Sequence, residues 1–492
     1  MLRLFYLFAC LSLSAPALAA EQSSEPPAAA VKVAPLPGEP AVAPPDTASS
    51  MDAVQQPLPG DSGMEQVQQR EMAKQKVGLL RATVKATEVK KGFFSGLFSP
   101  SSRPIDGELV GEMGRFIEQF PQLPETPEVY QLKAQVHKRM GNYRAAAMDW
   151  LVSLAAYPDS GFAFEARNGL QELAGDQLKQ QSKTVLAMRE KLDTLSGGRE
   201  QRVAELLVFL GTFQDKDFAG PIIDECNAFL MRNRDYPQPD GILNALAHQK
   251  MLLDDESALF YFNEVLALYP DSSVLPDSLL AIGNIQRNGK HYDEAVLRYK
   301  AVIAKYPDSK EARLAYVALA NMYDQDMHDY SNALKTYDAI VARYQDDPVV
   351  LHSLQAQAQI YQNKTNQPKE AIAAYKKLAD IFQGKDGLDA LLQAEKLAQY
   401  TLSDWKLSID INERIINSYP DSDEAPKALF ANAGIYENKL KNRDQALKLY
   451  QLFVEHYPSH SLAGQAKQRI SALQPQPQPL QSSQPQQKKL SP

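Results

Sequence analysis

An aromatic residue, in four places followed by Pro-Asp-Ser, recurs along this chain at a nearly constant interval. Tyr-Pro-Asp-Ser stands at 157, 269, 306 and 419, and Tyr-Pro-Ser-His stands at 457. The full series, in which Leu195 replaces one aromatic residue, advances in steps of 33 to 41 residues, mostly 37 or 38: Phe120, Tyr157, Leu195, Tyr236, Tyr269, Tyr306, Tyr344, Phe382, Tyr419 and Tyr457. Repeats of this length are typical of solenoids, in which each unit packs against its two neighbours. We therefore predict about nine stacked units.

The unit from Leu279 to Pro307 has the pattern of two short amphipathic helices joined by a polar turn at Asn288-Gly289-Lys290. Such short helices are not stable alone in water, so their apolar faces need neighbours. Gly283 and Ala295 are small enough to let the two helices approach closely. The sequence thus predicts an all-α superhelical solenoid of about nine helix pairs, with disordered N-terminal and C-terminal segments.

These residues resemble the tetratricopeptide repeat (TPR) family. Its pattern has a small residue in the first helix, Ala about twelve positions on, an aromatic residue about four later and Pro about eight after that. Five units match, the last three with one residue inserted in the turn: Gly283, Ala295, Tyr299 and Pro307; Ala134, Ala146, Trp150 and Pro158; Ala320, Ala333 and Tyr337; Ala358, Ala371 and Tyr375; Ala433, Ala446, Tyr450 and Pro458. The match is weak in 158–236 and in 383–419, where Ser408 and Asn412 occupy the Ala and aromatic positions. The resemblance covers roughly residues 120–473 and implies a TPR fold.

Residues 1–19 have the features of a secretory signal peptide. Arg3 supplies positive charge, Leu4 to Leu13 form the apolar region, and Ala17-Leu18-Ala19 form a small-residue cleavage site. We expect the mature chain to begin at Ala20, to be secreted across the inner membrane and to reside in the periplasm. Outer-membrane association stays open, because Leu7-Phe8-Ala9-Cys10 can also be read as a lipoprotein box with an acylated Cys10.

Once the signal peptide is removed, Cys226 is the only cysteine, so no intramolecular disulfide can form. We expect Cys226 to be a small buried apolar residue, because no reactive partner surrounds it in the sequence.

Two further segments have compositions that cannot bury enough apolar surface to fold. Residues 20–63 contain nine prolines with many alanines, and we interpret them as a disordered tether. Residues 474–492 contain seven Gln and five Pro, which predicts a disordered tail.

Residues 64–107 allow two interpretations. A basic helix over Met64–Lys91, with Val67, Val77, Leu80 and Val84 on one side, precedes the aromatic run Phe93–Phe98. Every solenoid needs caps, which favours this segment as a cap over the first helix pair. Basic residues next to exposed aromatics are also typical of interfacial anchors, so residues 70–98 could instead contact a membrane or a partner.

The repeats begin at Glu108, with Met113, Phe116 and Ile117 as the first apolar stripe. We divide them into an N-terminal TPR-like arm, 108–236, and a C-terminal TPR arm, 237–473. Gly197-Gly198 is the best candidate for a bend between the two arms.

No motif of an enzyme, a cofactor site or a metal site survives inspection. The chain has no Gly-rich phosphate loop, no His-Glu-x-x-His and no nucleophile elbow. His456 and His460 have metal-ligand spacing, but Pro458 lies between them at a helix end. The formal net charge of −8 argues against a nucleic-acid partner. We expect a non-enzymatic protein without cofactors.

A solenoid of helix pairs offers a groove lined by the first helix of each pair. In TPR proteins the residue after the small position of that helix, and those three and four beyond it, commonly face the groove. The resemblance places nine residues there: Asn284, Arg287, Asn288, Asn321, Asp324, Gln325, Gln359, Gln362 and Asn363. Amide side chains both donate and accept hydrogen bonds, which suits an extended peptide.

The export signal and the Tyr-Pro-Asp-Ser closures make this chain similar to the TPR proteins of the bacterial envelope, such as the Tol-Pal coordinator and the lipoprotein of the outer-membrane β-barrel assembly machine. The resemblance implies a scaffold that binds protein partners in envelope assembly, secretion or cell division. The alternative is a membrane-attached regulatory subunit of a cell-wall or polysaccharide synthesis or export complex.

Overall fold

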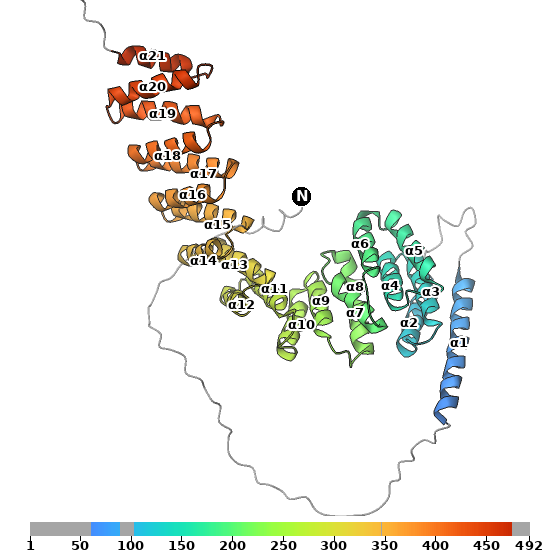
Figure 1. The fold of residues 1–492 in the computed structure, drawn as a ribbon. Coiled ribbons are helices and arrows are strands. Elements are labelled where there is room, and N and C mark those ends of the chain that lie inside the picture. The colour runs from blue at the N-terminus through green and yellow to red at the C-terminus, as the bar shows by residue number, and fades with distance from the viewer. Residues whose placement is uncertain (1–60, 89–102, 346, 475–492) are drawn as a thin grey trace, which may run out of the picture. The chain divides into compact units, whose positions relative to one another are not determined.

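The computed structural model describes residues 61–88, 103–345 and 347–474 (Figure 1). The segments interpreted as the signal peptide (1–19), most of the tether, the Phe93–Phe98 run and the tail beyond Gln474 lie outside the described residues. No described helix is long and apolar enough to cross a membrane.

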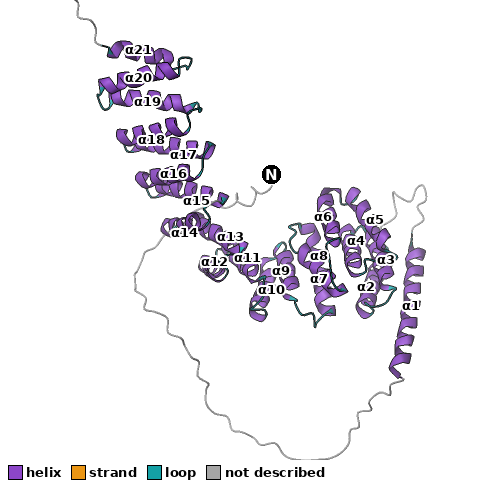
Figure 2. Cartoon of the chain, viewed as in Figure 1, coloured by secondary structure: helices purple, strands orange, loops and turns teal. Residues whose placement is uncertain are grey.

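The described residues form helices, and no strand occurs among them (Figure 2). In chain order the elements, with η1 a 3₁₀ turn and η2 to η4 π-helical turns, are α1(Asp61–Thr87), α2(Pro104–Gln119), α3(Thr126–Arg139), α4(Tyr143–Ala156), α5(Ala163–Gly175), η1(Lys179–Gln181), α6(Ser182–Leu192), α7(Arg199–Leu210), α8(Lys216–Arg232), α9(Asp240–Met251), α10(Asp255–Leu268), α11(Leu275–Asn288), α12(Tyr292–Lys305), α13(Lys310–Asn321), η2(Met322–Asp326), α14(Tyr330–Arg343), α15(Pro348–Gln359), η3(Ile360–Lys364), α16(Pro368–Ile381), α17(Lys385–Lys396), η4(Leu397–Thr401), α18(Trp405–Ser418), α19(Glu424–Asn438), α20(Arg443–His456) and α21(Ala463–Leu473).

Helices α3 to α20 form nine consecutive pairs, which confirms the predicted all-α solenoid. From α9 onward each helix packs mainly on the helix before it and the helix after it. The small residues of the TPR pattern lie where the two helices of a pair meet. A Cβ atom on Gly283 would lie only 2.8 Å from Cε1 of Tyr299, so only glycine fits there without a shift of the ring. Ala295 and Tyr299 are fully buried beside it.

The Tyr-Pro-Asp-Ser motif is a tight turn between successive pairs. At 306 the Ser309 N–H donates to the Tyr306 carbonyl oxygen (N···O 3.0 Å), with Pro307 at the position where a turn prefers proline. The Ser309 hydroxyl oxygen then accepts a hydrogen bond from the Ala312 N–H (3.0 Å) and caps α13. The motif therefore ends one helix, reverses the chain and begins the next helix.

In the units of Ala320 and Ala358 the inserted residue lies at the end of the first helix, in η2 and η3, and not in the turn, where we expected it. The unit of Ala433 has no such π-helical turn after α19, whereas the pair α17–α18 has one, η4. In η2, η3 and η4 the backbone makes bonds across five residues, as between the Met327 N–H and the Met322 carbonyl oxygen (2.9 Å). A π-helical turn accommodates one extra residue without changing the rest of the pair. Each turn then closes through a residue with a left-handed backbone, such as His328 (φ 54°) and Asn366 (φ 51°).

The pair α17–α18, where the TPR match is weak, replaces the small residue and its aromatic partner with a polar cluster. Glu395 Oε1 accepts a hydrogen bond from the Ser408 hydroxyl (2.9 Å). Asn412 Nδ2 donates to Asn432 Oδ1 of the next pair (2.9 Å). Polar side chains thus occupy the place of the apolar contact without breaking the stack.

Helix α1 covers the first helices of the solenoid. Val77, Leu80 and Val84 are buried in the N-terminal core, as the sequence predicted, together with Ala73. Val67, expected on the same side, is 67% exposed, because the buried stripe begins one turn later. Ion pairs from Lys76 to Glu112 (3.1 Å) and from Arg81 to Glu128 (2.5 Å) tie α1 to α2 and α3. One side of α1 therefore packs on the N-terminal core, and its role as a cap stays a prediction.

The N-terminal pairs pack differently from the later ones. Helix α4 is buried along most of its length and contacts α3, α5, α6, α7 and α8. One core cluster runs from Ala73 to Leu246, across the Gly197-Gly198 break where we expected a bend. The single described cysteine, Cys226, is fully buried in this cluster.

Candidate partner-binding site

Five of the nine residues expected to line the groove are exposed. They are Asn284, Asn288, Gln325, Gln359 and Asn363, on the first helices of three successive pairs. Because each carries an amide, this surface offers paired donors and acceptors spaced along consecutive repeats. We refer to these five residues as the amide stripe.

Tyrosine hydroxyl groups from the second helices form hydrogen bonds with polar side chains of the first helices beneath this surface. Tyr299 Oη donates to Asn284 Oδ1 (2.8 Å), and Tyr337 Oη donates to Asn321 Oδ1 (2.9 Å). In the next pair the Tyr375 hydroxyl reaches Gln362 Oε1 at 3.3 Å. The aromatic residues of the TPR pattern therefore also orient polar side chains of the first helices.

Asn321 does not belong to the accessible surface. Its side chain is only 2% exposed, and its oxygen is engaged by Tyr337. The expectation that Asn321 faces a partner is therefore wrong. Its role is structural, because loss of the acceptor would leave a buried hydroxyl unpaired.

The charged members of the predicted set, Arg287 and Asp324, are half-buried. Arg287 Nε contacts Asp326 Oδ2 of the following pair (2.5 Å). Burial raises the pKa of Asp324, although Lys364, His328 and His352 nearby oppose that rise. Arg287 therefore holds adjacent repeats together, and its guanidinium is not free for a ligand.

A hydrogen-bond cluster that the sequence did not point to joins α9 and α11. Asp277 Oδ2 lies 2.6 Å from His248 Nε2 and accepts from Asn244 Nδ2 (2.7 Å). Burial opposes ionisation of Asp277, but these hydrogen bonds and the charge of His248 keep its pKa below the usual value. The cluster thus links the first helices of two successive pairs, α9–α10 and α11–α12, through polar side chains.

The largest buried charge cluster lies between α3, α4 and α8. Asp149 is 1% exposed and contacts both Lys133 Nζ (2.7 Å) and His137 Nδ1 (2.7 Å). Burial raises the pKa of the neighbouring Glu225, which Lys133 and Arg232 oppose. These groups satisfy one another, so the cluster is a structural ion-pair network.

Acids, histidines and cysteines do not gather into a group that could hold a metal ion anywhere in the described residues. His460 Nδ1 accepts a hydrogen bond from the Leu462 N–H (3.2 Å), and its ring packs edge-on against Phe453. These two contacts account for the position of His460 before α21 without a metal ion.

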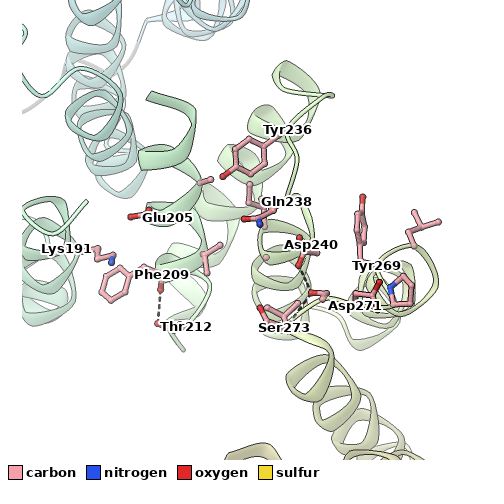
Figure 3. Close-up of a pocket in the computed structure, with 18 residues that line it drawn as sticks. Lys191, Glu205, Phe209, Thr212, Tyr236, Gln238, Asp240, Tyr269, Asp271 and Ser273 are labelled. Carbon is pink, nitrogen blue, oxygen red and sulfur yellow. Dashed lines mark hydrogen bonds between the residues drawn. The ribbon is translucent and has the colours of Figure 1, made fainter. Parts of the chain in front are cut away.

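A pocket of about 870 Å³ lies between α6, α7, α9 and the loop that follows α10. Figure 3 shows Lys191 and Phe209 on one side, Tyr269 and Asp271 on the other, and Tyr236 and Asp240 between them. No motif predicted this pocket. Its only trace in the sequence is the short step of 33 residues between Tyr236 and Tyr269.

Comparison with known families identifies the repeats. The tetratricopeptide repeat model matches residues 277–309 and 428–460, which correspond to the pairs α11–α12 and α19–α20. Two of the nine helix pairs thus match the tetratricopeptide repeat. No curated protein matches the sequence.

Solved structures similar to this chain share little sequence with it. A tetratricopeptide repeat protein from Parabacteroides merdae is 12% identical, covers 55% of this chain and 98% of its own length, and has a TM-score of 0.30. A chain of the APC/C hetero-tetramer Cut9-Hcn1 is 13% identical, with coverages of 76% and 79% and a TM-score of 0.27. A chain of Naa15/Naa10 bound to HypK-THB is 15% identical, with coverages of 81% and 61% and a TM-score of 0.29.

Proposed function

We propose that this chain is a non-enzymatic scaffold of the bacterial cell envelope whose amide stripe binds an extended segment of a protein partner. The observation that supports this most directly is the exposure of five amide side chains on three successive first helices. A peptide backbone presents alternating N–H and C=O groups, and amides can pair with both.

The envelope location is part of the proposal. It is supported by the signal-peptide features of residues 1–19 and by the resemblance to the Tol-Pal coordinator and the outer-membrane β-barrel assembly lipoprotein. The proposed role is therefore in envelope assembly, secretion or cell division, with the protein in the periplasm.

The test replaces equivalent exposed positions of three pairs together: Asn288→Ala, Gln325→Ala and Asn363→Ala. All three side chains are exposed and lie at or near the ends of first helices, so the fold should persist. A matched control replaces exposed uncharged polar residues of second helices: Asn263→Ala, Ser331→Ala and Gln451→Ala.

The measurement is crosslinking in intact cells followed by purification and quantitative mass spectrometry of the attached proteins. We expect the amide variant to lose most of a specific partner while the control keeps it. Equal recovery from both variants would refute the amide stripe as the binding surface.

A second candidate function is a membrane-attached regulatory subunit of a cell-wall or polysaccharide complex. It is favoured by the outer side of α1, where Met72 and Leu79 are exposed among the exposed basic residues Arg70 and Lys74. Such a surface suits anionic lipid head groups. Salt-extractable membrane association that depends on Met72 and Leu79 would support this candidate, and a freely released periplasmic protein would exclude it.

A further inference from the structure

The pocket opens beside a close contact between α7 and α9. A Cβ atom on Gly211 would lie 2.4 Å from Ala245 Cβ, so the helices are in close contact there. At the start of α9, a Cβ atom on Gly241 would lie 3.1 Å from Val208 Cγ2, so the absence of a side chain there lets Val208 border the pocket. The volume of about 870 Å³ is that of a site for a short peptide segment or a drug-sized ligand.

Apolar and aromatic groups form much of the wall. Phe209, Tyr236 and Tyr269 contribute rings from three different segments (Figure 3). Val208 and Leu268 are exposed large apolar side chains that border the same space. An occupant must therefore carry some apolar surface.

The charges of the lining are predominantly negative. Glu205, Asp240 and Asp271 line the pocket, whereas Lys191 is the one cation among the described lining residues. The Lys191 ammonium lies 5.7 Å from the centre of the Phe209 ring, so that ring already holds a cation at the pocket edge. Asp240 accepts a hydrogen bond from the Ser272 hydroxyl, which fixes the carboxylate in the wall.

The charges of Glu205 and Asp240 act on the hydroxyl of Tyr236. Burial raises its pKa, and the charges of Glu205 and Asp240 raise it further. The carboxylates of α7 and α9 therefore both act on the part of the pocket beside Tyr236.

We infer that this pocket binds a cationic segment of a partner protein, in which an Arg or Lys side chain is flanked by an apolar residue. Cationic groups of the segment pair with Glu205 on one side of the pocket or with Asp271 on the other and lie against the tyrosine rings, while the apolar neighbour contacts Val208 and Leu268. The site is separate from the amide stripe and does not depend on it.

A neighbouring hollow of about 440 Å³ meets the pocket at Tyr236 but has a different charge. It is lined by Arg232 and Arg234 as well as by Glu200 and Asp235, so its acids and bases balance. The preference for a cation therefore belongs to the larger pocket.

The experiment uses the purified protein and two fluorescein-labelled hexapeptides, one of alternating Arg and Leu and one of alternating Gln and Leu. Fluorescence anisotropy gives the dissociation constant of each. We expect the Arg-Leu peptide to bind and the Gln-Leu peptide to bind at least about tenfold more weakly.

Two kinds of variant locate the binding. Glu205→Gln with Asp271→Asn removes two negative charges from the pocket and should weaken Arg-Leu binding about tenfold. Gly241→Phe places a ring in the cavity and should weaken it by a similar factor while leaving the net charge unchanged. The matched control, Asp159→Asn with Asp421→Asn, also removes two negative charges, but from exposed aspartates of two other Tyr-Pro-Asp-Ser turns. It should leave binding unchanged.

Equal weakening in the pocket pair and in the control pair would mean attraction to the overall negative charge and would overturn the inference. Absence of Arg-Leu binding, or equal binding of both peptides, would overturn it as well. If Gly241→Phe fails to fold, as judged by its circular dichroism melt, the two charge pairs still decide. The amide-stripe variant should bind the Arg-Leu peptide normally, so this test and the test of the proposed function can fail separately.

Discussion

Single residues decide how closely the helices of a pair approach. Gly283 and Gly434 are both glycines of first helices, but a Cβ on Gly283 would strike the Tyr299 ring, whereas the nearest atom to a Cβ on Gly434 is Tyr450 Oη at 3.8 Å. The same amino acid is thus required at one position and dispensable at the other.

Gly283→Ala should therefore lower the free energy of unfolding by about 1–3 kcal/mol, because the ring must move in a packed core. Gly434→Ala should leave it unchanged or raise it by up to about 1 kcal/mol, since alanine favours the helix. Urea unfolding followed by circular dichroism measures both. A Gly283→Ala protein as stable as the wild type would show that the ring moves without cost.

Glu395 gives the pair α17–α18 a dependence on pH. Burial raises its pKa, and the hydrogen bonds from Ser408 and Asn412 only partly oppose this. A carboxyl whose pKa is higher in the folded state than in the unfolded state binds its proton more tightly when folded. Its charge therefore costs stability as pH rises from the unfolded value, near about 4.3, through the folded value.

Glu395→Gln removes that charge and keeps a hydrogen-bond acceptor for Ser408. We expect the variant to have a higher Tm than the wild type at pH 7.5, with the difference shrinking towards pH 4.5. Thermal melts at both pH values measure it. A difference that stays constant with pH would contradict the assignment of the effect to ionisation.

At the scale of elements, α1 shows how a helix with basic and apolar residues is divided between core and solvent. Leu80 is 5% exposed and Leu79 is 67% exposed, although they are adjacent. The buried stripe seals the first helices, and the remaining apolar residues face outward.

Leu80→Ala should destabilise the attachment of α1 by about 2–4 kcal/mol, because it leaves a cavity in the core. Leu79→Ala should have almost no effect on stability. Hydrogen exchange of α1 amides, followed by mass spectrometry, separates the two variants. Similar exchange in both would mean that α1 does not act as a cap.

The sequence predicted the elements better than the site. The aromatic series located the ends of second helices, since Tyr306, Tyr344 and Tyr419 are the C-caps of α12, α14 and α18. The π-helical turns were missed, since a residue inserted at Met322–Asp326 or in the following turn gives the same spacing in the sequence.

The groove residues were only partly predictable for a related reason. In each pair either of two polar positions of the first helix can accept a hydrogen bond from one tyrosine hydroxyl. Tyr337 bonds Asn321 in one pair, whereas Tyr375 bonds Gln362 in the next. Residue type alone does not show which side chain is drawn inward. The pocket is formed by four separate segments, so no local pattern marks it.

At the scale of the molecule, two modes of packing occur in the described chain. Helices from α9 onward mainly contact the helices next to them in the chain, whereas α4 also contacts α6, α7 and α8, which come later in the sequence. Stability should therefore be local in the C-terminal pairs and shared in the N-terminal ones.

Leu391→Ala, in a fully buried position of α17, should speed hydrogen exchange in α15 to α19 and leave α3 to α8 protected. Leu151→Ala, equally buried in α4, should speed exchange throughout α3 to α8. Mass spectrometry of both variants under native conditions makes the comparison. Uniform loss of protection in both would mean that the chain unfolds as one cooperative unit.

Cys226 has a consequence of another kind. Its thiol is enclosed by the N-terminal core, and burial raises its pKa, so a reagent in solvent reaches it only when α8 opens. In a chain that begins at Ala20 no second cysteine competes for label. The rate at which an uncharged alkylating agent modifies Cys226 should therefore report how often the N-terminal core opens around α8, without any engineered probe.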